Sequence, residues 1–241
     1  MGYYVKVEPN VKVYVEDLNP DGKKTIVFLH GWPGNHNLFE YQFNQLPKLG
    51  YRCIGIDQRG FGKSDKPYGG YDYDRLSDDV RCVVNGLRLH DFILAGHSTG
   101  GAIAIRYMSR HKGYGVSKLA LFASAAPSLI KRPNFPYGLE KEDVIKIIEG
   151  TYTDRPKMLS DFGDTFFFQH ISKQFSDLAE INVPTLIIHG IHDKVVPFQL
   201  GKVQNQSIRN SKLLPFEFSG HASFYDQRDR FNEELVKFIE E

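Results

Sequence analysis

The sequence predicts an α/β fold with a mostly parallel central sheet, on three observations. Short apolar runs recur along the chain and alternate with stretches of helical periodicity. Most of these runs are apolar throughout, as in strands that are covered on both faces. The chain has 241 residues, of which 41% are hydrophobic, a size and composition that suit one soluble domain. We therefore expect a sheet of about eight strands with helices on both faces.

The strands are expected where apolar runs are bounded by turn residues. A hairpin opens the chain and leads into a buried strand, because Pro9-Asn10 and the turn at 19–22 interrupt the N-terminal segment. Each later strand, up to the last, precedes a helical stretch. Strands are expected at Tyr3–Val7, Val11–Glu16, Thr25–His30, Cys53–Ile56, Phe92–Ala95, Leu119–Ala123, Thr185–Ile188 and Leu213–Phe218.

Helices fit between these strands. In the 75–89 stretch, apolar residues fall on one helical face, which is typical of a helix that covers a sheet. Helices are expected at Leu38–Leu49, Arg75–Leu89, Gly100–Arg110, Phe198–Ser207 and Gln227–Ile239.

One long segment, 128–183, interrupts the alternation of strands and helices. It lies between two core strands, and its sequence is helical, irregular and rich in aromatic residues. A sheet does not need an insertion of this size for closure, so we expect a small helical cap over a core formed by 1–127 and 184–241. Phe162, Phe166 and Val196 are candidates for lining a substrate pocket. Alternatively, the phenylalanines only pack the cap against the core.

Composition excludes several classes of partner. The chain has 30 Lys and Arg against 29 Asp and Glu, and a net charge of +1 gives no field for nucleic acid or an anionic membrane. No apolar run is long enough for a bilayer, and the N-terminus reads as a strand instead of a secretion signal. Cys53 and Cys82 are expected to be reduced, which favours a cytoplasmic location. The oligomeric state stays open.

The chemistry begins at Gly96-His97-Ser98-Thr99-Gly100. This pattern follows an apolar strand and opens a helix, the context in which Gly-x-Ser-x-Gly forms a nucleophile elbow. The pattern alone is also compatible with a tight turn that needs glycines. At an elbow, the neighbours of the serine must be small, and its hydroxyl projects above the sheet. Ser98 is therefore the candidate nucleophile.

An alcohol needs a base to take its proton and a third group to orient that base. Asp193 follows the strand at 185–188, and His221 follows the last strand as the only histidine beyond Asp193. The order Ser98, Asp193, His221 is therefore met without choosing among candidates. Since His221 must be neutral to act as a base, activity should fall as the solution is acidified.

A developing oxyanion also needs N–H donors. The helix behind Ser98 offers the backbone N–H of Thr99, and the loop His30-Gly31-Trp32-Pro33-Gly34 is placed to offer that of Trp32. We expect these two amides to form the oxyanion hole. The side chains of His97 and Thr99 are expected to pack and shape the site.

Together these motifs resemble the cofactor-free haloperoxidase or perhydrolase branch of the α/β-hydrolases, and the similarity covers nearly the whole chain. It rests on His30-Gly31-Trp32-Pro33, on the loop at 57–65, on the elbow at 96–101, and on Asp193 and His221. The resemblance implies a serine carboxylesterase with no metal or other cofactor, acting on a small-molecule ester. It also implies peracid formation with hydrogen peroxide, because family members with that activity carry a proline at the place of Pro33.

The chain departs from this family in one respect. Ser98 and Asp193 are 95 positions apart, and the family usually has a longer cap between the corresponding residues. A short cap should leave the site open to water and to bulky acyl groups.

Other interpretations of the motifs remain. An amidase or lactamase would use the same triad, and a non-catalytic small-molecule-binding protein could share the scaffold, although its triad should be damaged. His189, His192 and Asp193 resemble a metal cluster, but a fourth ligand is missing nearby. Asp57 and Arg59 are expected to hold their glycine-rich loop by hydrogen bonds.

Overall fold

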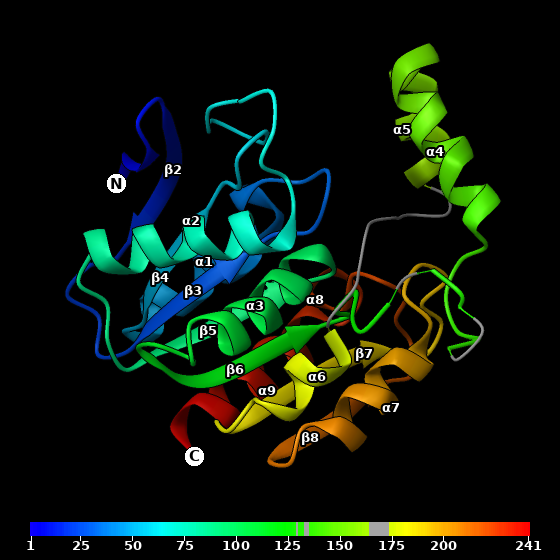
Figure 1. Cartoon of the computed structure of the whole chain (residues 1–241). Coiled ribbons are helices and arrows are strands. Elements are labelled where there is room, and N and C mark those ends of the chain that lie inside the picture. Colours follow the sequence, from blue (N-terminus) through cyan, green and yellow to red (C-terminus); the bar gives the residue numbers. More distant parts are fainter. Residues whose placement is uncertain (129, 133–134, 164–173) are drawn as a thin grey trace.

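Figure 1 shows the computed structural model of the chain, which describes all residues except 129, 133–134 and 164–173. The described strands form an eight-stranded sheet in the order β1-β2-β4-β3-β5-β6-β7-β8. The β1–β2 and β2–β4 pairs are antiparallel and all other pairs are parallel. The predicted fold class is therefore confirmed. The strands are β1 Gly2–Glu8, β2 Val11–Leu18, β3 Thr25–Leu29, β4 Arg52–Ile56, β5 Phe92–His97, β6 Val116–Phe122, β7 Thr185–Gly190 and β8 Ser211–Phe216.

The helices predicted outside the 128–183 segment lie near their expected positions, but one of them is broken and a short helix at Ser223–Asp226 was not predicted. The stretch expected to be one helix at 38–49 consists of three short pieces, η1, α1 and η2, and Pro47 stands at the start of η2. A proline donates no backbone hydrogen bond, so a regular helix does not continue through it. The pieces are η1 His36–Phe39, α1 Glu40–Gln45 and η2 Leu46–Leu49. The other helices are α2 Tyr73–Gly86, α3 Thr99–Arg110, α4 Lys141–Thr153, α5 Arg155–Gly163, α6 Gln174–Ala179, α7 Phe198–Ser207, α8 Ser223–Asp226 and α9 Arg228–Glu240.

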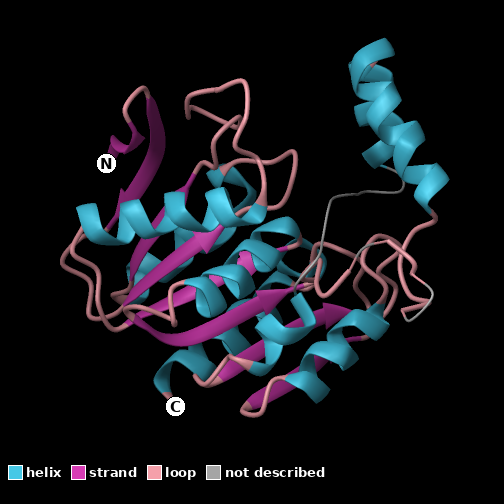
Figure 2. Cartoon of the chain, in the orientation of Figure 1, coloured by secondary structure: helices cyan, strands magenta, loops and turns pink. Residues whose placement is uncertain are grey.

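The sheet is the middle of three layers, as Figure 2 shows. One core packs the apolar faces of α2, α3 and α6 against one side of the sheet, with Val83, Ile105 and Leu178 among its fully buried residues. The other core packs α1, α8 and α9 against the opposite side, with Phe224 and Phe231 buried. Both faces of the central strands are thus covered, which explains why their sequences are apolar throughout.

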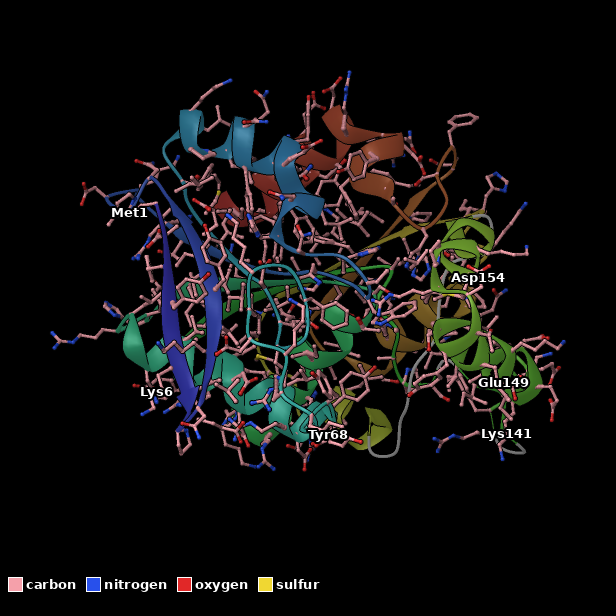
Figure 3. All side chains as sticks on the ribbon, turned by 90° about the horizontal axis from the view of Figure 1, so that it is seen from above. Met1, Lys6, Tyr68, Lys141, Glu149 and Asp154 are labelled. Carbon is pink, nitrogen blue, oxygen red and sulfur yellow. The ribbon has the colours of Figure 1, made fainter. Side chains whose placement is uncertain are left out.

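The segment between β6 and β7 stands apart from these layers only in part, because its helix α6 packs against the sheet. Its helices α4 and α5 form a pair that projects from the body of the molecule in Figure 1. In the view of Figure 3, Lys141 and Glu149 lie at the opposite side from Met1 and Lys6 of the N-terminal hairpin. The domain boundaries 1–127, 128–183 and 184–241 stay a prediction.

Two further predictions concern the cysteines and the absence of membrane-spanning helices. Cys53 and Cys82 are both free thiols; Cys53 is buried, whereas Cys82 is half-buried. Among the described residues, no helix has the length and apolar character required to cross a bilayer.

Candidate active site

Ser98 stands at a sharp turn between β5 and α3. Its backbone has φ +53° and ψ −119°, a conformation that is strained for a residue with a side chain. The turn is held because the Ser98 N–H donates to the Phe122 carbonyl at 3.0 Å, and the Ser98 carbonyl accepts from Ala125 N–H at 2.9 Å. These bonds to the chain at and after β6 fix the serine at the carboxyl edge of the sheet.

The glycines of the elbow allow the close approach of two loops. A Cβ atom on Gly100 would lie 2.3 Å from the Leu29 carbonyl oxygen, and one on Gly31 would lie 2.9 Å from Cβ of Ser98. Any larger residue at either position would push the loop after β3 away from the elbow. The sequence pattern therefore brings the loop that carries Trp32 against Ser98.

The side chain of Ser98 is fully buried. Its Oγ atom has no hydrogen-bond partner within the part of the chain that the structure describes. Since a buried hydroxyl normally has a partner, such an atom marks a position where strain or function outweighs stability.

Asp193 follows β7 and is held from several sides. Its Oδ1 atom accepts hydrogen bonds from the backbone N–H groups of Val195 at 2.8 Å and Val196 at 2.9 Å. Its Oδ2 atom lies 2.8 Å from Nδ1 of His221 and 3.3 Å from Nε2 of His189. Burial raises the pKa of the Asp193 carboxyl, but the charge and hydrogen bond of His221, together with the nearby His189, outweigh this effect and hold the pKa below its usual range. The carboxyl is therefore ionised at neutral pH.

The hydrogen bond to Asp193 settles which nitrogen of His221 is basic. An ionised carboxylate only accepts, so Nδ1 of His221 carries the proton that it donates. In the neutral ring, the lone pair is then on Nε2. Asp193 and His221, predicted from sequence order alone, are thus brought together as an oriented carboxylate–imidazole pair.

His97 places this pair beside the elbow. Its Nε2–H donates to the backbone carbonyl of His221 at 3.0 Å, and the two ring centroids are 4.5 Å apart. Burial, followed by the charge of His221, lowers the pKa of His97 well below its usual range, so His97 is neutral. Because His97 immediately precedes Ser98, the His221 ring packs against the residue next to the candidate nucleophile.

The two amides predicted for the oxyanion hole also lie together. Thr99 opens α3, and the first N–H groups of a helix have no acceptor within the helix. The Trp32 N–H lies close by and donates to Oγ1 of the Thr99 side chain at 2.9 Å. The loop after β3 and the start of α3 therefore form one corner of the site.

A pocket of about 430 Å³ opens from this corner. Trp32 and Thr99 line it together with residues of the loop after β4 and of the helices α2, α3, α4 and α5. Tyr73 and Leu76 come from α2, Ile103 from α3 and Tyr152 from α4. The pocket is therefore mainly aromatic and aliphatic, and the projecting helix α4 contributes to its wall.

The residues predicted to bind substrate fall in different places. Phe166 lies outside the described residues, and Phe162 belongs to α5 but its side chain is not described. Val196 is fully buried in a small cluster against which Trp32 packs, and it is not among the residues that line the pocket. The pocket-lining role of these three residues stays a prediction.

The residues set aside in the sequence have structural partners. Asp57 accepts hydrogen bonds from the His36 and Lys63 N–H groups, at 2.7 and 2.8 Å. Arg59 forms a buried ion pair with Asp79, whose oxygens lie 2.6 and 2.7 Å from the guanidinium. Among the described residues, no group of His, Cys, Asp and Glu could hold a metal ion.

Sequence reasoning missed two parts of the site. His189 was considered only as a metal ligand, but its Nε2–H donates to the Val196 carbonyl at 2.8 Å and lies beside Asp193. The available signal was its position at the end of β7, four residues before Asp193. The pocket residues of α2 and α3 could not have been found, because in the sequence they read as ordinary core positions.

The chain matches a family model described as alpha/beta hydrolase fold over residues 24–154. The chain belongs to the α/β-hydrolase family. It is 44% identical to the AB hydrolase superfamily protein YisY of Bacillus subtilis, over 99% of both chains. It is 28% identical to a bifunctional esterase/perhydrolase of Acinetobacter calcoaceticus, over 98% of this chain and 99% of that protein.

A solved structure carries the family relationship further. An esterase of Exiguobacterium antarcticum superposes with a TM-score of 0.94 at 39% identity, and all of each chain is covered. The alignment with the Bacillus subtilis relative spans 267 positions although this chain has 241 residues, so that relative carries residues that this α/β-hydrolase lacks.

Proposed function

We propose that the protein is a serine hydrolase that cleaves carboxylic esters through an acyl-enzyme. The observation that carries the proposal is the buried hydrogen bond between Asp193 and Nδ1 of His221, beside a serine held at a strained elbow. The bond leaves the Nε2 atom of His221 as the base that the Ser98 hydroxyl requires. Similarity to an esterase and to an esterase/perhydrolase agrees with this chemistry.

The reaction then proceeds in two balanced halves. His221 takes the Ser98 proton while Oγ forms a bond to the ester carbonyl carbon, whose oxygen becomes an oxyanion at the Trp32 and Thr99 corner. The oxyanion collapses, the bond to the alcohol oxygen breaks, and His221 gives its proton to the departing alcohol. Water, deprotonated by His221, attacks the acyl-enzyme and releases the carboxylic acid by the same steps in reverse.

The size and lining of the pocket favour a small, mainly apolar ester as the substrate. The pocket holds about 430 Å³ and is lined by aromatic and aliphatic side chains, with Arg155 at its α5 wall. Binding of an acyl chain there would remove apolar surface from water at about 25 cal/mol per Å².

The direct test is hydrolysis of a p-nitrophenyl ester by the unmodified chain and by Ser98→Ala. We expect the variant to lose kcat by about 10⁴-fold or more. Ser117→Ala is a matched control, because Ser117 lies near the amino end of β6, far along the strand from the carboxyl edge. Equal loss in both variants, or no loss in Ser98→Ala, contradicts the proposal.

A second activity, perhydrolysis, is favoured by Pro33 beside Trp32 and by similarity to a bifunctional esterase/perhydrolase. In this reaction a carboxylic acid acylates Ser98 with loss of water, and hydrogen peroxide then replaces water as the nucleophile that attacks the acyl-enzyme, so that Ser98 is freed and a peracid leaves. Formation of peracid from acetate and peroxide, lost in Ser98→Ala, is the expected result. A rate that is unchanged in Ser98→Ala would show that the triad does not perform it.

A further inference from the structure

The hydrogen bond between the Trp32 amide and the Thr99 hydroxyl changes the count of donors at the oxyanion corner. The Trp32 N–H carries one proton, and in this structure it points to Oγ1 of Thr99 at 2.9 Å. A single N–H makes one strong hydrogen bond, so this amide is already satisfied by the side-chain hydroxyl. The donors that remain for a bound ester at this corner therefore differ from the two backbone amides expected from the sequence.

The Thr99 side chain, which carries this hydroxyl, lines the pocket. Thr99 is buried, with 6% of its surface exposed, yet it lines the same pocket as Trp32. Oγ1 accepts the Trp32 N–H with one of its two lone pairs, and its own proton can be donated to a further acceptor. Thr99 directly follows Ser98 at the start of α3, so its hydroxyl and the candidate nucleophile belong to the same elbow.

We propose that the Thr99 side-chain hydroxyl is a catalytic residue that donates its proton in a hydrogen bond to the developing oxyanion, with the Trp32 amide behind it. The inference rests on the proposed ester hydrolysis. Two groups of one residue, the Thr99 N–H and the Thr99 O–H, then face the same oxygen. Trp32 acts through the hydroxyl and is a positioning residue in this arrangement.

The chain of two hydrogen bonds favours the transition state. A hydroxyl that accepts a hydrogen bond becomes a stronger donor, because the two bonds polarise one another. Its bond to a charged oxyanion is stronger than its bond to the neutral carbonyl of bound substrate. Removing the hydroxyl should therefore lower kcat and leave KM nearly unchanged.

The opposite arrangement makes the opposite prediction. If the hydroxyl only occupied the Trp32 amide, the oxyanion would have to displace it. Loss of the hydroxyl would then free the amide and raise kcat. The sign of the change in kcat decides between the two arrangements.

The experiment compares Thr99→Val with Thr99→Ser on one p-nitrophenyl ester. Valine matches threonine in shape without the hydroxyl, and serine keeps the hydroxyl without the methyl group. We expect Thr99→Val to lose about 10²-fold in kcat with KM within about twofold, and Thr99→Ser to stay near the unmodified enzyme. Thr99→Ala removes the same hydroxyl without filling the space and should lose kcat to the same extent, so the test does not depend on one variant folding.

The control is Thr185→Val, a buried threonine at the amino end of β7 whose hydroxyl donates to the Val183 carbonyl. It should keep its kcat. A second readout is the Ki of a boronic acid, which mimics the tetrahedral oxyanion and should weaken in parallel with kcat. Unchanged or raised kcat in Thr99→Val, with hydrolysis intact in the unmodified enzyme, overturns the role of the hydroxyl alone. Absence of hydrolysis in the unmodified enzyme overturns it together with the proposed function.

Discussion

The carboxyl edge of the sheet and the segment between β6 and β7 are built in different ways. At the edge, hydrogen bonds connect each loop to a neighbouring element. Asp193 accepts from two backbone amides, the His221 carbonyl accepts from His97, and the backbone of Ser98 is bonded to the chain at and after β6. The described helices α4 and α5 pack mainly on each other and leave Ile145 and Ile148 exposed. We therefore expect the edge to carry the chemistry and the helices α4 and α5, which contribute to the pocket wall, to affect selectivity.

The largest effect should come from the edge. Asp193→Asn keeps the size of the side chain but removes the charge that orients the Nδ1 proton of His221. We expect kcat to fall by about 10⁴-fold because the imidazole then presents the wrong tautomer. Steady-state kinetics with a p-nitrophenyl ester measures this, and a loss below tenfold would break the claim that the edge carries the reaction.

The edge should also make folding sensitive to acid. Burial lowers the pKa of His30 from 6.5 to about 4. Between these pH values the unfolded chain binds a proton that the folded protein does not, so stability is complete above about pH 6.5 and falls as pH decreases through about 4. The total contribution is about 3 kcal/mol. His30→Gln should flatten the pH dependence of the free energy of unfolding, measured with urea from pH 7 to 4.5.

Two results would contradict this pH prediction. One is an equal slope in the variant and the unmodified protein. The other is a stability that increases on acidification in this range. Buried His97, whose pKa is also lowered, is expected to leave part of the slope in His30→Gln.

A smaller effect is expected from Pro33, which we propose to influence whether water or hydrogen peroxide attacks the acyl-enzyme. Pro33→Ala should lower the ratio of perhydrolysis to hydrolysis by about tenfold, which corresponds to about 1.4 kcal/mol in barrier height. Parallel assays of peracid and of free acid, with and without hydrogen peroxide, give this ratio. An unchanged ratio would show that Pro33 does not select peroxide.

The smallest effect should come from the segment between β6 and β7. Tyr152 lines the pocket from α4 and is 87% exposed, so we expect only long acyl chains to reach it and Tyr152→Ala to remove that contact. We expect KM for long-chain esters to rise about threefold, with no change for acetate esters. Tyr68→Ala is the control, since Tyr68 is fully exposed and does not line this pocket. Equal changes for all chain lengths would contradict a role in selectivity.

The sequence predicted the parts of the molecule in which one residue type meets one physical need. Apolar runs gave the strands because both sheet faces are covered, and the elbow was readable because only glycine fits at positions such as Gly100. Asp193 and His221 were found through their places after β7 and β8. The pairing of the Trp32 amide with the Thr99 hydroxyl was not foreseeable, since it depends on a side-chain rotamer.

The lining of the pocket was also beyond the sequence. The break of the predicted helix at 38–49 had a signal in Pro47, which lies in the first turn of η2, but this signal was not used. Tyr73, Ile103 and Tyr152 come from three helices, and only the packing of those helices brings them to one pocket. Local periodicity carries no information on such long-range contacts.

The most direct test of the account is labelling with a fluorophosphonate probe, which reacts only with a serine activated by a neighbouring base. The unmodified chain should take up one equivalent rapidly, on Ser98 by mass spectrometry, and Ser98→Ala should take up none. Labelling at another residue, or no labelling of a folded chain, would contradict the claim that Ser98, His221 and Asp193 act together.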